Sequence, residues 1–253
     1  MTLSATLPAQ PSTSAADVLL LALDTSTSHS SGALCDRRKP LATASLGLPR
    51  RHGEYLAPAI RFCLDQADAT ADDVTGVVDG RGPGLYTGLR VGLITARTFA
   101  ATRRLPLVGV SGLDVLAHQA RHADRTIAAV IDARRREVFW ALYAPVPGGM
   151  TRVTEPAVGS ASHVANEIAG RGESVLAVGD GALAWADTLV DAGADIGDVD
   201  LATPKAEHMA ALSVPRFERE ETQRPDEVTP MYLRDADAKI GWEQRGRLRG
   251  GVA

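Results

Sequence analysis

The fold is decided by the stretch Val18-Leu-Leu-Leu-Ala-Leu-Asp-Thr-Ser-Thr27. Six apolar residues run without a break from Val18 to Leu23 and stop at a polar turn, which is typical of a buried strand. Strand and helix patterns then alternate, as they do in α/β proteins. We expect further strands at Ser31–Cys35, Leu41–Leu46, Val74–Val78 and Leu107–Val110, and helices at Gly53–Ala69, Gly88–Arg103 and Leu113–His122.

The second half of the chain repeats this order. A strand Ile127–Ile131 ends at Asp132, and a strand at Glu137–Tyr143, a third near Val153–Val158, a helix at Ser162–Ala169 and a strand at Val175–Val178 follow. The repeat has a period of roughly one hundred residues and predicts two α/β lobes, the second degenerate. We place a disordered head at residues 1–17, lobes at 18–110 and 111–219, and a partly ordered charged tail at 220–253. The first helix of the second lobe and a last helix, Lys205–Arg219, are expected to pack back on lobe one.

Composition excludes several classes of protein. The 253 residues carry a formal net charge of -4, so the chain lacks the basic footprint of a stand-alone RNA-binding protein. Cys35 and Cys63 have no partner at metal-ligand spacing, which indicates reduced thiols. No apolar run approaches the roughly 20 residues of a membrane helix, and the head does not resemble a signal peptide. We therefore expect a cytoplasmic protein.

Two turns occupy positions where α/β ATPases of the actin and heat-shock chaperone type bind phosphate. Asp24-Thr-Ser-Thr27 has Ser26 where those hairpins have glycine, and its Cβ would hinder the approach of a phosphate to the backbone. Asp132 begins the corresponding turn of the second half, which also lacks the glycine. Asp24, Thr25, Ser26, Thr27 and Asp132 thus form either degenerate phosphate sites or ordinary strand-end turns.

A glycine-rich connection joins the strand Val74–Val78 to the following helix. It reads Gly80-Arg-Gly-Pro-Gly-Leu-Tyr-Thr-Gly-Leu-Arg90, which is neither a P-loop nor a dinucleotide fingerprint. Its N–H groups could hold an anion at the helix N-terminus. The alternative is a tight connection that packs closely on its neighbours.

The same connection resembles the signature loop of the TsaB (YeaZ) family, Gly-Pro-Gly-Ser-Phe-Thr-Gly-Leu-Arg. The matching positions are Gly82, Pro83, Gly84, Thr87, Gly88 and Arg90. Further matches follow in order, from Asp24-Thr-Ser-Thr27 to Pro230-Met-Tyr-Leu-Arg234. The resemblance implies a duplicated actin-like fold and a role in threonylcarbamoyladenosine formation on tRNA. It also implies support of a catalytic paralogue of the TsaD type, with a TsaE-type ATPase as third partner and tRNA contacted only through the complex.

A catalytic metal site is not expected. The His-x-x-x-His motif of the catalytic relatives falls on Gly112 and Leu116, which cannot ligate a metal. His118 and His122 have the spacing of one helix face, but they lack a third ligand. No catalytic residues are therefore assigned, and labels of glycoprotease activity have no chemistry to rest on.

A partner surface is predicted on the first two helices. Leu56, Ile60, Cys63 and Ala67 form the core stripe of the first helix, which leaves a flank of Tyr55, Ala59, Phe62 and Gln66. The second helix is apolar or small nearly all round and contributes Leu89, Leu93 and Ala96. A neighbouring helix of the same domain could cover these residues equally well. The family resemblance favours pairing through them, both in a homodimer and with the paralogue.

We therefore interpret the chain as a non-catalytic scaffold and activator of a tRNA-modifying transferase. The alternative is a small nucleotide-dependent kinase or ATPase that uses Asp24 and Asp132 around Mg-ATP. A third candidate, a metalloprotease, lacks ligands. No tightly bound cofactor is expected, and room for a nucleotide is left only at a junction with a partner.

Overall fold

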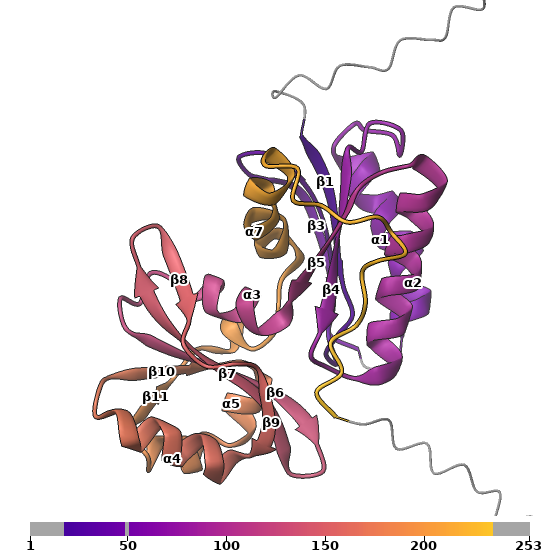
Figure 1. Cartoon of the computed structure of the whole chain (residues 1–253). Helices are drawn as coiled ribbons and strands as arrows, with labels where there is room; N and C mark the ends of the chain where they lie inside the picture. Colours follow the sequence, from indigo (N-terminus) through magenta and orange to yellow (C-terminus); the bar gives the residue numbers. More distant parts are fainter. Residues whose placement is uncertain (1–17, 49–50, 235–253) are drawn as a thin grey trace, which may run out of the picture.

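The computed structural model describes residues 18–48 and 51–234, which form two lobes around two sheets (Figure 1). The predicted head, residues 1–17, and residues 235–253 of the tail lie outside this part. The first sheet contains, in spatial order, β3 (Pro40–Leu46), β2 (Ser30–Asp36), β1 (Leu19–Asp24), β4 (Gly76–Gly82) and β5 (Leu107–Ser111). The second contains β8 (Gly149–Arg152), β7 (Glu137–Val146), β6 (Thr126–Arg134), β10 (Val175–Val178) and β11 (Ala194–Ile196), with β9 (Ala157–Ser160) also paired to β7.

Both sheets have the same topology. In each, the first strand pairs antiparallel with the second and parallel with the fourth, and the fifth extends the parallel side. The predicted duplication is thereby confirmed, and the fold is the two-lobed, actin-like α/β class. The helices are α1 (His52–Gln66), α2 (Tyr86–Arg103), α3 (Gly112–Gln119), α4 (Ala161–Arg171), α5 (Asp180–Ala184), α6 (Ala186–Val190) and α7 (Ala206–Glu218), with a 3-10 turn η1 (Val199–Leu201).

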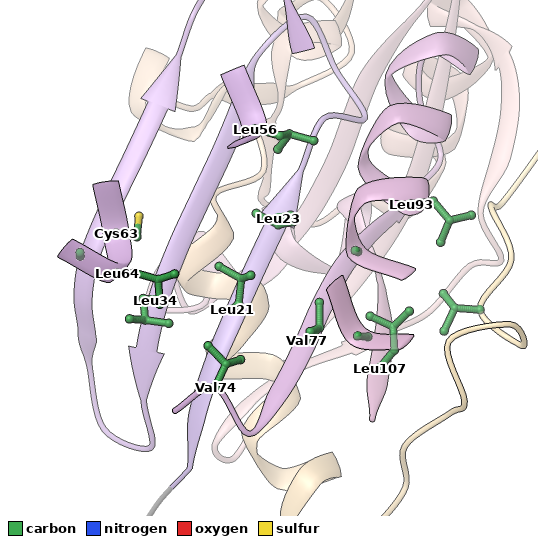
Figure 2. Packing of buried hydrophobic residues seen from close by; sticks show 14 residues of the cluster. Leu21, Leu23, Leu34, Leu56, Cys63, Leu64, Val74, Val77, Leu93 and Leu107 are labelled. Carbon is green, nitrogen blue, oxygen red and sulfur yellow. The ribbon is translucent and has the colours of Figure 1, made fainter. Parts of the chain in front are cut away.

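Helices cover both faces of the first sheet (Figure 1). On one face α1 and α2 bury an aliphatic cluster that includes Leu21, Leu56 and Leu93 (Figure 2). On the other face α7 places Met209 and Ala210 against Leu20 and Val78 of the sheet. Because β1 is covered on both sides, its run of apolar residues has no polar alternation.

The second lobe departs from the prediction at its third strand. Instead of one strand at Val153–Val158 there are two, β8 before this segment and β9 from Ala157 onward, and they pair with different parts of β7. Pro156 lies between them and has no N–H to donate to a ladder, which accounts for the break. The α4 and α6 helices contribute Ile168 and Leu189 to the core of this lobe.

The first part of the predicted tail, from Glu220 to Arg234, packs against both lobes. Val228 is buried in the core of the first lobe, and Gln223 pairs with Leu107 at the edge of the sheet. Arg234 reaches the second lobe, where it donates to the carbonyl of Ala133 and pairs with Glu137. We call residues 222–234 the strap, because the segment joins both lobes.

Two features, the cysteines and the lengths of the apolar helices, are both predicted from composition. Cys35 and Cys63 are buried and form no disulfide, as predicted. Burial raises the pKa of Cys35 to about 12, so its thiol is unreactive. No helix within residues 18–48 and 51–234 is both long enough and apolar enough to cross a bilayer.

Candidate functional site

The turn that follows β1 is sealed inside the first lobe. Asp24, Thr25, Ser26 and Thr27 each expose no more than 1% of their surface. The Ser26 hydroxyl donates to the Asp24 carboxylate over 3.1 Å, and the Thr25 hydroxyl donates to the carbonyl of Gly88 over 2.7 Å. The turn thus satisfies its polar groups with protein partners rather than presenting them to a ligand.

The signature loop is what seals this turn. The N–H of Leu85 donates to the carbonyl of Ser26 over 2.7 Å. A Cβ on Gly84 would lie 2.0 Å from the Ser26 carbonyl oxygen, and one on Gly88 would lie 2.0 Å from that of Thr25. Close backbone packing therefore explains these glycines.

Other parts of the loop face outward or continue the packing. Gly82 has a left-handed φ of 92° and a cis peptide bond to Pro83, which is buried. Thr87 and Arg90 are exposed on the first turns of α2. The Arg90 guanidinium lies 4.0 Å from the centre of the Tyr86 ring and donates to the Tyr232 hydroxyl of the strap.

A second buried carboxyl, Asp79, was not among the predicted residues. It is completely buried on β4, and neither side-chain oxygen has a hydrogen-bond partner within the described part of the chain. Burial and the nearby Asp24 hold its pKa well above the usual range. Burial likewise raises the pKa of Asp24 to about 6. A lone carboxylate within the apolar strand Val77-Val78-Asp79 was the signal that could have identified it.

The corresponding turn of the second lobe is open. Asp132 accepts from the backbone and side chain of Arg134, while its own N–H donates to Asp180 over 2.9 Å. Arg134, Arg135 and Arg136 all have left-handed φ angles, between 56° and 64°. Burial raises the pKa of Asp180 to about 6. This turn presents guanidinium groups where the first presents none.

A cavity of about 950 Å³ lies between the two turns. Its lining includes Ser28, His52, Tyr86, Thr87 and Arg134. No side chain caps the N-terminus of α2 there, and the His52 ring bonds the Ser30 hydroxyl over 2.7 Å. A free helix N-terminus beside an arginine can attract an anion. The residues that line this cavity include no carboxylate.

Comparisons with known proteins identify the family. A TsaB protein, "tRNA threonylcarbamoyladenosine biosynthesis protein TsaB" of Escherichia coli, is 31% identical over 89% of this chain and 97% of its own length. The chain belongs to the TsaB family. The protein of the same name from Bacillus subtilis is 29% identical over 88% of this chain and 97% of its own. A family model described as "TsaD: tRNA N6-adenosine threonylcarbamoyltransferase" matches residues 48–242.

Solved structures agree with this membership of the TsaB family. An uncharacterized Pseudomonas aeruginosa protein "with similarity to peptidase YEAZ" is 29% identical, with a TM-score of 0.74 over 86% of this chain and all of that one. A structure of YeaZ from Pseudomonas aeruginosa is 28% identical, with a TM-score of 0.72 over 85% of this chain.

The positions considered for a metal site in this TsaB-family chain lie on α3 or just after it. Gly112 and Leu116 lie on α3 and are buried. The prediction that His118 and His122 share a helix face is wrong, because α3 ends at Gln119. His118 instead packs edge-to-face on His208 of α7. Within residues 18–48 and 51–234, no three His, Cys, Asp or Glu side chains are grouped as metal ligands.

Four residues of the predicted partner surface are placed wrongly by the sequence analysis. Ala59, Leu89, Leu93 and Ala96 expose no more than 5% of their surface, because α1 and α2 turn these sides toward the sheet. On α2, small and apolar residues occur on all sides, so the sequence does not indicate which side is buried. On α1, the buried side contains Ala59, where the sequence analysis expected Ile60.

The remaining predicted residues lie at the surface or its margin. Tyr55 is half-buried and donates its hydroxyl to the carbonyl of Ala44, whereas Gln66 is exposed. Phe62 on α1 exposes 48% of its surface, and Ile94 on α2, which was not predicted, exposes 62%. The two helices pack side by side on the same face of the first sheet (Figure 1). We call Phe62, Gln66 and Ile94 the outer helical face.

Proposed function

We propose that this chain is a non-catalytic scaffold and activator in the formation of threonylcarbamoyladenosine on tRNA. It acts beside a catalytic paralogue of the TsaD type and a TsaE-type ATPase in the cytoplasm, and it meets tRNA only through that complex. The names of its relatives support the pathway, and the net charge of -4 is consistent with RNA contacts on another subunit.

The observation that carries the non-catalytic role is the sealed turn at Asp24–Thr27. An ATPase of this fold needs that turn open to phosphate, and here the loop Gly82–Leu85 covers the turn. At the second turn, Asp132 is paired with Arg134 and the neighbouring Asp180 accepts from the Asp132 N–H, so both carboxylates have partners within the chain. This arrangement supports the scaffold over a small kinase or ATPase.

The outer helical face supports the pairing role. Exposed Phe62 and Ile94 would be desolvated by a partner helix pair, and a duplicated fold offers such a pair on a paralogue or a second copy. We propose that the homodimer and the complex with the paralogue use this face and therefore compete.

The test of pairing uses exposed positions, since Ala59→Arg would disrupt the core of the first lobe instead of a surface. Phe62→Arg and Ile94→Arg should each weaken self-association in light scattering, and capture of a purified TsaD-type protein, by at least about tenfold. The matched control is Val199→Arg, which changes a 70% exposed apolar residue of the second lobe. Weakening by the control alone, or of one assembly alone, would contradict the shared face.

A second assay addresses catalysis. The purified chain should neither transfer threonylcarbamoyl to tRNA nor hydrolyse ATP, whereas the reconstituted complex should need the chain for transfer. Turnover by the isolated chain that Asp24→Ala abolishes would overturn the assignment in favour of the ATPase.

A nucleotide at a junction with the partner would meet Arg134 and the N-terminus of α2, and equilibrium dialysis should detect it in the complex and not in the isolated chain.

A further inference from the structure

A separate cavity of about 500 Å³ opens between the lobes, away from the turns described above. It takes its lining from β4 and β5 of the first sheet, from α3 and β8, from α7 and from the strap. Its volume falls in the range of small-molecule sites. Apolar side chains including Val110, Met150, Leu212 and Met231 form part of the wall.

The lining carries an excess of positive charge. Arg152 is neutralised, because its guanidinium makes a bidentate contact with Asp114 at 2.6 and 2.8 Å. Arg81 and Arg216 also line the cavity, and within the described residues no carboxylate lies at ion-pair distance from either. Arg216 donates to the carbonyls of Gly109 and Glu221, and the Glu221 carboxylate is already paired with Arg219.

Two buried polar atoms of the lining have no partner. Ser111 exposes 4% of its surface, and its hydroxyl makes no hydrogen bond within residues 18–48 and 51–234. The Nε of Arg81 is also buried, and it has no hydrogen-bond partner among the same residues. Buried hydrogen-bond donors normally have an acceptor. The unpaired Ser111 hydroxyl and Arg81 Nε therefore indicate that a ligand supplies acceptors in this cavity.

The position in the fold agrees with this. Arg81 and Ser111 stand at the carboxyl ends of the parallel strands β4 and β5. In open α/β sheets, ligands bind outside these ends. Ser111 also precedes α3, whose N-terminus has no side-chain cap, although Asp114 in its first turn offsets part of the helix dipole.

We propose that this inter-lobe cavity binds a small organic anion. A carboxylate or phosphate group would contact Arg81, Arg216 and the Ser111 hydroxyl, and an apolar body would lie against Val110 and Leu212. Guanidinium groups pair with carboxylate or phosphate through two parallel hydrogen bonds, which a neutral ligand of the same shape cannot form. Because both lobes and the strap line the cavity, a bound anion would hold them together.

Isothermal titration calorimetry of the full chain tests this, with phenyl phosphate and phenylacetate as probes and benzyl alcohol as their neutral counterpart. One of the two anions should bind saturably with a Kd at or below about 1 mM, and benzyl alcohol should not. Preference between the anions identifies the charged group.

Arg81→Gln, Arg216→Gln and the cavity-filling Thr151→Phe should each weaken binding by at least about tenfold. Arg61→Gln, at an 85% exposed guanidinium of α1 outside the lining, is the control and should bind as the wild type does. Circular dichroism shows which of the three variants fold. The binding result of any variant that folds is enough to test the proposal. Absence of saturable binding by wild type, equal binding by the variants, or loss on Arg134→Gln would overturn the proposal.

Discussion

The two lobes have the same strand order, yet the turns after their first strands have become opposites. In the first lobe, Asp24–Thr27 is buried beneath the signature loop, and Leu85 bonds directly to it. In the second, Asp132–Arg136 is open and carries three arginines in left-handed conformations. The first turn is thus covered by the chain, whereas the second is accessible and carries arginines.

The difference shows how a glycine-containing loop can close over a turn. Ser26 is the visible departure from an ATPase hairpin in the sequence, but Gly84 and Gly88 are what allow the backbone to close over the turn. The second turn also lacks that glycine and stays exposed at Arg134–Arg136. The following predictions test whether this contrast is real.

The largest effect is expected at the seal. Gly84→Ala would place a Cβ 2.0 Å from the Ser26 carbonyl oxygen, and both partners are backbone, so the free energy of unfolding should fall by at least about 3 kcal/mol. The measurement is urea unfolding followed by circular dichroism. Gly170→Ala in α4 meets no atom within 4 Å and should be neutral or stabilising by up to about 1 kcal/mol. Equal stability of the two variants would mean that the seal is loose.

The next effect concerns the pH dependence of stability. The pKa of Asp24 is raised from 3.8 to about 6 on folding, so the stability that its protonated form provides is full below about pH 4 and is lost as pH rises through about 6. Asp24→Asn cannot titrate. Its stability relative to wild type should therefore rise between pH 4 and 7, by at most about 3 kcal/mol.

Unfolding series at several pH values measure this effect. Asp65→Asn, at a carboxylate that is 65% exposed, serves as the control for replacing a surface carboxylate. A profile of Asp24→Asn parallel to that of wild type would show that Asp24 is ionised in the folded protein.

A smaller effect is expected from restoring the missing glycine. Ser26→Gly removes the hydroxyl that donates to Asp24, which should cost about 1 kcal/mol. The variant should not bind ATP, because the N–H of Leu85 still donates to the backbone carbonyl of residue 26 and the loop still covers the turn. Calorimetry with Mg-ATP checks this, and binding by Ser26→Gly would show that the serine, not the loop, closes the site.

The smallest effect is expected in the open turn. Arg136 has a φ of 64°, a conformation that glycine adopts without strain, so Arg136→Gly should leave stability unchanged or raise it by up to about 1 kcal/mol. Arg61→Gly within α1 should instead lower stability by about 1 kcal/mol. Thermal unfolding compares the two. A clear loss for Arg136→Gly would mean that the turn is held by its side chain.

Much of the fold could be predicted from the sequence because it depends on short-range patterns. The apolar run before Asp24 and its counterpart before Asp132 identified both central strands, and the strand Val175–Val178 was predicted with its observed bounds. Helix ends were less accurate, since α3 stops at Gln119 without the breaker that a sequence would reveal.

The site was harder to predict because it depends on contacts between distant segments. The alternative of a tight connection for the signature loop agrees with the structure, but which turn it packs on could not be inferred from local pattern. The buried side of α2 was mistaken because alanine and leucine occur on several of its sides. Asp79 and the course of the strap depend on tertiary packing that has no periodic signal.

The strap has a mechanical consequence. The chain passes between the lobes at Ser111–Gly112, returns before α7 and passes again through the strap, which Arg234 fastens to β6 and β7. Two bodies linked by two crossings can swing about the line that joins them, and a third link restricts that swing. The lobes should then move as one unit, so that a partner seated on one lobe finds the other at a constant distance.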